Sequence, residues 1–102
     1  MAYNDLAKFE WDEKKDRSNR RKHGLSFSEA SELFKGARDY LEIFDSSHSE
    51  VEDRSLAIGE IRRGIAVVVF TEREGDVVRI IGARFATKRE QDRYYSFLDE
   101  RP

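Results

Sequence analysis

The sequence predicts an α+β fold: two N-terminal helices, a four-stranded antiparallel sheet and a C-terminal helix. Two capping-box patterns, Ser26 with Glu29 and Thr87 with Glu90, mark the starts of two helices, one toward each end of the chain. The helix that begins at Thr87 is predicted to end near Glu100. Between them the apolar residues change from helical spacing to the alternation and short continuous runs that are typical of strands. Helices, then a run of strands, then a last helix favour the α+β class.

The N-terminal third is expected to form a helical hairpin after a frayed lead-in at residues 1–8. Helices are predicted at residues 12–22 and 26–35, and only a few residues join them. Phe27 and Leu33 belong to an apolar set at helical spacing, so they are predicted to face the core. Each helix is bounded by residues that suit a helix end: the N-caps Asp12 and Ser26, and the glycines Gly24 and Gly36.

Strands are predicted from residue 40 onward. The most apolar of them, residues 65–71, should be central because both of its faces are apolar. Short segments around Gly64 and Gly75 suit tight hairpin turns, whereas residues 45–53 form an acidic polar loop. The four predicted strands are residues 40–44, 54–62, 65–71 and 77–84.

The composition fits one small domain spanning residues 1–102. Apolar residues make up 38% of the chain and charged residues 39%, so the core must be small and densely surrounded by charge. The chain has no cysteine, which excludes disulfide and thiolate chemistry and suits a reducing cytoplasm. Its longest apolar run, Ile65 to Phe70, is far too short to span a membrane. We therefore expect a cytoplasmic protein without a membrane segment.

Charge is distributed unevenly along the chain, although the net charge is only −2. Residues 39–60 hold one arginine against seven acids, a local net charge of −6. Residues 14–22 hold six cations against one aspartate. A chain that is acidic overall can therefore still present a basic face to an anionic partner.

Two arginines stand on the apolar strand at residues 77–84. Strand interiors usually reject charge, so Arg79 and Arg84 predict a surface for an anion, and we favour the phosphate of RNA. The alternative is a structural ion pair with a neighbouring strand, for instance through Glu60 or Glu72.

The spacing of these two arginines sets a condition on a shared site. Residues five apart in a regular strand point to opposite faces of the sheet. A bulge between Arg79 and Arg84 would bring them to one face, and Gly82 is a suitable place for it. If the strand is regular, Arg84 is the better candidate.

Ordered strings along nearly the whole chain resemble the BrnT toxin family. Each string is weak alone, but the ordered set at family-like spacing is specific. One position departs from the pattern, because Gly82 stands where a small serine-like residue is expected. The matching strings are Phe9-Glu10-Trp11-Asp12, Lys22-His23-Gly24, Phe27-Ser28-Glu29-Ala30, His48-Ser49-Glu50-Val51-Glu52-Asp53-Arg54 with Ile58-Gly59, Arg79-Ile80-Ile81-Gly82-Ala83-Arg84, and Ala86-Thr87-Lys88-Arg89-Glu90.

The resemblance implies a RelE-like fold and a type II toxin, an endoribonuclease that cuts RNA with neither a metal nor another cofactor. It also implies a BrnA-like ribbon-helix-helix antitoxin that neutralises the toxin, and operator DNA that is bound only through the antitoxin complex. The alternative is a non-catalytic module of the same fold that binds RNA or protein within an operon-repressing complex.

Seven residues are candidates for the functional site. Arg79 and Arg84 would stabilise a phosphate that gains negative charge, and His23 could carry protons near neutral pH. His23 could instead be only a C-terminal cap of its helix. The residues expected to bind RNA are Lys15 and Lys22, on one helical stripe with Trp11, Asn19 and His23, together with Arg54 and Lys88 in the matching strings.

A metal site is not expected in this chain. His48 lies among the acidic residues of the 45–53 loop, but the spacing matches no metal-binding motif. A solvated or antitoxin-facing loop is the preferred interpretation.

Overall fold

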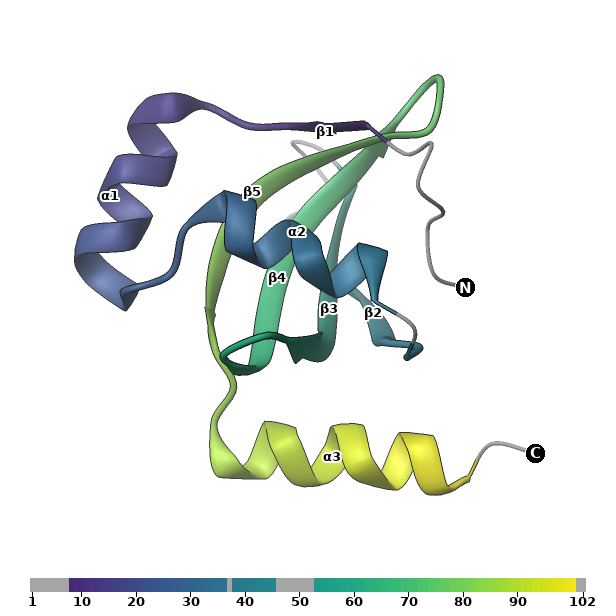
Figure 1. The fold of residues 1–102 in the computed structure, drawn as a ribbon. Coiled ribbons are helices and arrows are strands. Elements are labelled where there is room, and N and C mark those ends of the chain that lie inside the picture. Colours follow the sequence, from purple (N-terminus) through teal and green to yellow (C-terminus); the bar gives the residue numbers. More distant parts are fainter. Residues whose placement is uncertain (1–7, 37, 46–52, 101–102) are drawn as a thin grey trace.

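The structure, a computed structural model, describes residues 8–36, 38–45 and 53–100. It has three helices and a five-stranded sheet, which confirms the predicted α+β class (Figure 1). Helices α1, α2 and α3 comprise Glu13–His23, Phe27–Lys35 and Lys88–Asp99. Strands β1 to β5 comprise Lys8–Glu10, Leu41–Asp45, Arg54–Ile61, Gly64–Arg73 and Val77–Phe85.

The strand order in the sheet is β1-β5-β4-β3-β2. Strands β2 to β5 form the predicted antiparallel meander. The prediction of four strands is one short, because β1 pairs in parallel with β5 and aligns Phe9 with Val78. Lys8 therefore lies in a strand rather than in a frayed lead-in, and residues 1–7 lie outside the described residues. A three-residue strand carries too short an apolar pattern to be recognised, and its partner is distant in the sequence.

The predicted caps are present at all three helix starts. The Asp12 carboxylate accepts hydrogen bonds from two backbone N–H groups in the first turn of α1, at 2.7 and 3.3 Å. Both capping boxes form, at residues 26–29 and 87–90. Helix α1 runs one residue further than predicted, to His23, and Gly24 follows with φ 68°, a left-handed conformation that favours glycine.

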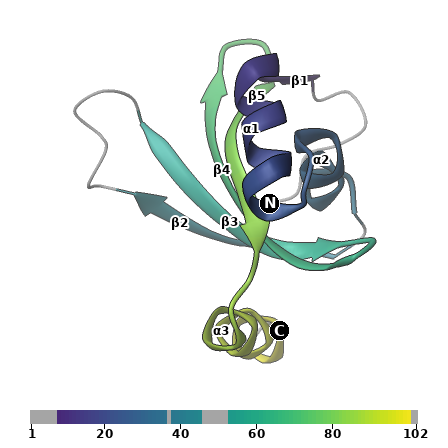
Figure 2. The same cartoon turned by 90° about the vertical axis from the view of Figure 1, so that its left-hand side faces the viewer.

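Helix α2 covers one face of the sheet, which we call the first face, and α1 lies beside β5 (Figures 1 and 2). A Cβ atom on Gly59 would lie 2.9 Å from side-chain atoms of both Leu33 and Tyr40, so glycine allows α2 to approach β3 closely. Trp11 packs edge-on against Phe27 with ring centroids 6.3 Å apart, and this supports a core anchor rather than an RNA contact. The buried core of this face includes Leu25, Phe27, Leu33, Phe34, Val68, Phe70, Val78 and Ile80.

Two buried polar side chains attach α1 to the rest of the fold. The Asp16 carboxylate accepts a hydrogen bond from the backbone N–H of Phe27 at 2.8 Å. The Asn19 amide donates to the carbonyl oxygens of Leu25 and Ala83, each at 2.8 Å, and accepts from the N–H of Ala83 at 3.2 Å. Asn19 therefore bonds the edge of β5 as a neighbouring strand would, and its role is structural rather than RNA binding.

Helix α3 packs against one end of the opposite face, which we call the second face. Tyr94 is fully buried there and its hydroxyl donates to the carbonyl oxygen of Asp39 at 3.1 Å. Phe97 and Leu98 flank Tyr94 and pack with it against strand residues that include Ile58 and Val67. The other end of the second face is left less covered, because Val69 and Thr71 on β4 stay half-buried.

Within the described part of the chain, no helix is long and apolar enough to cross a membrane. Residues 46–52 of the predicted acidic loop, including His48, lie outside the described residues. Among the described residues, no cluster of His, Cys, Asp and Glu could hold a metal ion.

Candidate active site on the second face

A bulge in β5 places Arg79 and Arg84 on the same face of the sheet. Arg79 pairs with Thr71 of β4, and Arg84 pairs with Val67. Thr71 and Val67 are four residues apart in β4, which has no extra residue here, so their side chains point to the same face. The two arginines opposite them in β5 therefore share that face as well. Ile81 is the extra residue, because the register jumps from Phe70–Ile80 to Val69–Gly82. The predicted condition for a shared site is therefore met, with the bulge next to Gly82.

A third candidate, Arg54, lies on this second face as well. Leu56 of β3 pairs with Val69, and alternation places Arg54, two residues earlier, on the same face as Leu56. Continuing the register by one residue sets Arg54 opposite Thr71, across β4 from Arg79. At the usual strand spacing, the backbones of Arg54 and Arg79 are about 10 Å apart.

The floor between these arginines is formed by small or half-buried residues. Thr71, Val69 and Leu56 are half-buried, unlike the buried residues on the opposite face of the same strands. Gly82 has no side chain, so the backbone between Arg79 and Arg84 is accessible from this face. A Cβ atom there would meet Val69 only at ordinary contact distance, 3.8 Å, so the serine-like residue expected at this position would also fit.

Arg84 is held by a carboxylate at the start of α3. Its Nη1 and Nη2 atoms donate to Glu90 at 2.7 and 2.8 Å, a two-pronged ion pair. Glu90 also accepts from the backbone N–H of Thr87 at 2.9 Å and so completes the cap of α3. The hydrogen bonds from Arg84 lower the pKa of Glu90 from 4.5 to about 2, and the same contact raises the pKa of Arg84. Both groups are therefore charged at neutral pH, and the guanidinium is fixed on the second face.

Arg79 makes a longer ion pair with β1. Its Nη1 atom lies 3.8 Å from the Glu10 carboxylate, which also binds Arg73 Nε at 2.9 Å. The alternative of an ion pair with a neighbouring strand is therefore found, but its carboxylate is Glu10 of β1 rather than Glu60 or Glu72. Only 29% of the Arg79 side chain is exposed, compared with 41% of Arg84. Because a 3.8 Å contact is too long for a hydrogen bond, the Arg79 guanidinium is held less tightly by its carboxylate than Arg84 is.

His23, Lys15 and Lys22 lie together on α1, beside Ile81 of β5. They line a small pocket of about 210 Å³ with Ile81, the bulged residue of β5. Neither Arg79 nor Arg84 lines this pocket. His23 occupies the predicted place in the last turn of α1, and the structure brings it to the edge of β5 rather than onto the second face.

The last RNA-binding candidate, Lys88, lies in the first turn of α3. It is 83% exposed and forms an ion pair with Asp92, one turn further along the helix. Lys88 follows Arg84 closely in the sequence, but the structure gives them no shared contact among the described residues.

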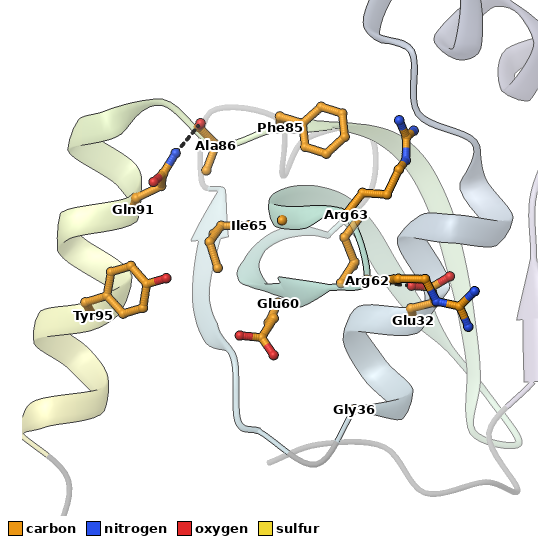
Figure 3. Close-up of a pocket in the computed structure, with 12 residues that line it drawn as sticks. Glu32, Gly36, Glu60, Arg62, Arg63, Ile65, Phe85, Ala86, Gln91 and Tyr95 are labelled. Carbon is orange, nitrogen blue, oxygen red and sulfur yellow. Dashed lines mark hydrogen bonds between the residues drawn. The ribbon is translucent and has the colours of Figure 1, made fainter.

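A larger open pocket of about 690 Å³ lies elsewhere, between α2, α3 and the turn that joins β3 to β4 (Figure 3). The guanidinium of Arg63 lies over the ring of Phe85 there, 5.3 Å from its centroid. Glu32 and Glu60 line the same pocket as Arg62 and Arg63, so its charges are balanced. The second face has ion pairs as well, but it brings three arginines together on neighbouring strands, which suits a polyanion.

Sequence reasoning missed the carboxylates Glu10 and Glu90 as partners of the arginines. Glu90 was recognised as part of a capping box, but its ion pair depends on how the chain turns between β5 and α3. Glu10 gave no signal, because its pairing with Arg79 requires the unpredicted strand β1.

Comparison with known proteins identifies the family of this chain. A family model described as the ribonuclease toxin BrnT of type II toxin-antitoxin systems matches residues 11–90. Among solved structures, the 1.1 Å crystal structure of the Brucella abortus ribonuclease toxin BrnT is similar, with a TM-score of 0.63. It shares 27% sequence identity over 80% of this chain and 99% of that one. Comparison with curated proteins found no match. Since the family model spans most of its length, the chain belongs to the BrnT ribonuclease toxins of type II toxin-antitoxin systems.

Proposed function

We propose that this ribonuclease toxin cuts RNA on the second face of its sheet, with Arg79 and Arg84 around the scissile phosphate. The observation that carries the proposal is the bulge at Ile81, which gives the two arginines a common face. Guanidinium groups stay charged at any working pH and match phosphate oxygens in geometry. Fixed cations at the phosphate supply the charge stabilisation that such a transition state needs, and in this proposal no metal ion is required.

The proposed reaction uses the 2′-hydroxyl of the RNA as nucleophile. A base removes the proton of this hydroxyl, its oxygen attacks the adjacent phosphorus, and the bond from phosphorus to the 5′-oxygen of the next nucleotide breaks. An acid returns a proton to that 5′-oxygen. The products are a 2′,3′-cyclic phosphate and a 5′-hydroxyl, and charge on the crowded phosphate is matched by Arg79 and Arg84.

His23 is our candidate for one of the two proton transfers. Imidazole titrates near neutral pH, and a proton carrier of this kind contributes roughly 10²–10⁴-fold in rate. The lining of the small pocket by His23 and Ile81 supports this choice, since it sets the imidazole beside the bulge that orients the arginines. Lys15, Lys22, Arg54 and Lys88 are proposed to bind neighbouring phosphates.

The test is expression of the toxin alone, with Arg79→Ala, Arg84→Ala and His23→Ala beside the parent. We expect the parent to arrest growth and each variant to relieve the arrest while its circular dichroism remains that of the folded protein. The purified parent should cut RNA equally well with and without EDTA. If all three variants stay as toxic as the parent, the site assignment is wrong, and if EDTA abolishes cleavage, the metal-independent mechanism is wrong.

Membership of a type II toxin-antitoxin family implies an antitoxin partner and an RNA target. We propose further that the antitoxin is a BrnA-like ribbon-helix-helix protein, that operator DNA is bound only through the antitoxin complex, and that the single domain acts in the cytoplasm. Co-expression with such an antitoxin should restore growth, and operator DNA should be retarded in a gel by the complex but not by the toxin alone.

A further inference from the structure

Helix α1 contains no apolar residue, which is unusual for a helix that packs on a sheet. Its sequence is Glu-Lys-Lys-Asp-Arg-Ser-Asn-Arg-Arg-Lys-His, and only Asp16 and Asn19 are buried. Both of these are occupied by hydrogen bonds to the fold, as described above. The attachment of α1 is therefore polar, and the rest of its surface is free to carry charge.

The outward surface of α1 is mainly cationic. Asp16 is buried, and the exposed Glu13, one turn before Arg17, accepts a hydrogen bond from the indole N–H of Trp11 at 3.2 Å. Arg20 Nε forms an ion pair with Asp16 at 3.7 Å, so Arg20 is not counted among the unpaired cations of this helix. At about 3.6 residues per turn, the other five cations span roughly 160° of the helix circumference. They are Lys14, Lys15, Arg17, Arg21 and Lys22, all exposed, and within the described part of the chain none of them forms an ion pair.

The cations furthest from β5 border an open groove of about 670 Å³. The described residues that line it are Lys14, Arg17, Arg20 and Arg21, with no carboxylate among them. Arg17 and Arg21 are one turn apart, where like charges repel each other. A surface that keeps this repulsion fits an anion with several charges better than it fits a neutral partner.

We propose that the outward surface of α1, through Lys14, Arg17 and Arg21, binds the phosphate backbone of RNA beyond the segment that is cut. The inference rests on the proposed function and extends it to residues outside the cleavage site. Helix α1 borders β5 directly, and β5 carries Arg79 and Arg84 on its second face (Figure 2). RNA that lies over those arginines needs only to cross the edge of the sheet to reach α1.

This surface acts by position and charge rather than by reading bases. Phosphate contacts fix the register of a nucleic acid and carry no sequence information. We therefore expect Lys14, Arg17 and Arg21 to increase the affinity for long RNA of any sequence and to leave the chemical step unchanged.

The test compares two triple variants that remove the same charge. One is Lys14→Gln with Arg17→Gln and Arg21→Gln. The matched control is Lys8→Gln with Arg62→Gln and Arg89→Gln, three exposed cations that lie outside α1. Binding is measured by fluorescence anisotropy over a range of salt concentrations. The probe is a cleavage-resistant RNA of about twenty nucleotides whose 2′-hydroxyls are methylated, so that no 2′-hydroxyl can attack the phosphate. Cleavage is measured separately with an RNA too short to reach Lys14, Arg17 and Arg21.

The α1 triple variant should bind the long RNA roughly tenfold more weakly than the parent at moderate salt. Its logarithmic salt slope should be smaller by about 2, since each lost phosphate contact on single-stranded RNA contributes about 0.7. The control should bind within about twofold of the parent, and both variants should cut the short RNA at the rate of the parent.

Three outcomes would overturn the inference. Equal losses in the two triple variants would show an effect of net charge alone. Loss of short-RNA cleavage in the α1 variant would place these cations in the cutting site. Parental RNA binding with reduced antitoxin affinity would assign the surface to the protein partner. The proposed function is tested separately, because it is wrong if the parent protein cuts no RNA. In that case the RNA affinities of the two triple variants can still be compared.

Discussion

The starts of α2 and α3 have the same arrangement of a capping box and an ion pair, but the arginines in the two ion pairs have different roles. In each, the glutamate of a capping box also binds an arginine with both carboxylate oxygens. Glu29 accepts from Arg63 at 2.7 and 3.1 Å. Glu90 accepts from Arg84 at 2.7 and 2.8 Å. One carboxylate thus serves a helix end and a cation at once.

The two arginines use their remaining donors differently. Arg63 lies over Phe85 (Figure 3). It also donates to the carbonyl oxygen of Gly24 at 2.6 Å, so it ties the end of α1 to the turn between β3 and β4. Arg84 lies on the second face with Arg79, and its Nε atom makes no hydrogen bond within the described residues. The same local pattern therefore closes the fold at one end and presents an oriented cation at the other.

The largest expected effect separates the two arginines themselves. Arg84→Ala should lower the rate of RNA cleavage by about 10²–10³-fold, as loss of one well-placed transition-state donor does. Arg63→Ala should leave cleavage by the folded protein unchanged and lower the thermal midpoint of unfolding. Cleavage assays and melting curves on both variants check this, and similar losses of cleavage in the two would remove the distinction.

A smaller effect should separate the two glutamates. Glu90→Gln should lower kcat roughly tenfold, because the Arg84 guanidinium loses the partner that fixes its position. KM should not rise, since a carboxylate that would repel the RNA phosphate is removed as well. Glu29→Gln, the matched control, should keep both constants. A rise in KM at constant kcat in Glu90→Gln would show that Glu90 contributes to binding rather than to the position of Arg84.

Acid stability should distinguish the same pair of variants. The pKa of Glu90 is lowered from 4.5 to about 2 by the hydrogen bonds of Arg84. A carboxyl with a lowered folded pKa stabilises the fold above its unfolded value and loses that contribution as pH falls through the folded value. The free energy of unfolding of Glu90→Gln should therefore decline less than that of the parent between pH 4.5 and 2.

The same measurement on Glu29→Gln gives the comparison. Arg63 lowers the pKa of Glu29 by the same kind of hydrogen bond, but the Glu29 side chain is more exposed, at 33% against 26%. We expect a smaller change of slope in this variant. Denaturant titrations at a series of pH values test both, and a slope in Glu90→Gln equal to that of the parent would contradict the assigned pKa.

The smallest effect is expected from variants that remove the N-cap hydroxyl and keep the ion pair between glutamate and arginine. Ser26→Ala and Thr87→Val should each cost about 1 kcal/mol of stability, which is typical of a lost N-cap. That loss lowers the melting temperature of a chain of this size by about 4–8 °C. Cleavage should stay within about twofold of the parent in both variants, because Glu90 still binds Arg84. If Thr87→Val slows cleavage as strongly as Glu90→Gln, the cap rather than the ion pair positions the arginine.

Local signals in the sequence were enough to predict most of the fold. Capping boxes, glycines at helix ends and the change of apolar period lie within a few residues of one another, and each predicted helix and strand was found. Strand β1 was missed because it is only three residues long and pairs with β5, almost seventy positions away. Its apolar contact, Phe9 on the first-face core, becomes meaningful only once that pairing is known.

The candidate site was predicted only in part, because its residues can be recognised from local sequence but their arrangement depends on distant pairing. Arg79 and Arg84 could be chosen from their chemistry on an apolar strand, but their common face depends on one extra residue in β5. A regular strand and a bulged strand fit the apolar pattern almost equally well. Alternation therefore shows that a shared face requires a bulge, but it does not show whether the bulge is present. Asn19 is a further example, because a polar residue in a basic helix gives no sign of the β5 backbone groups that it binds.

The hydrogen bonds of Asn19 also determine how another chain can approach this protein. Strand β1 ends at Glu10, opposite Arg79, so beyond that point the edge of β5 would otherwise offer unpaired backbone groups to an incoming strand. The Asn19 amide already occupies both the N–H and the carbonyl oxygen of Ala83. Extension of the sheet by a second copy or by a partner strand is therefore obstructed at Ala83.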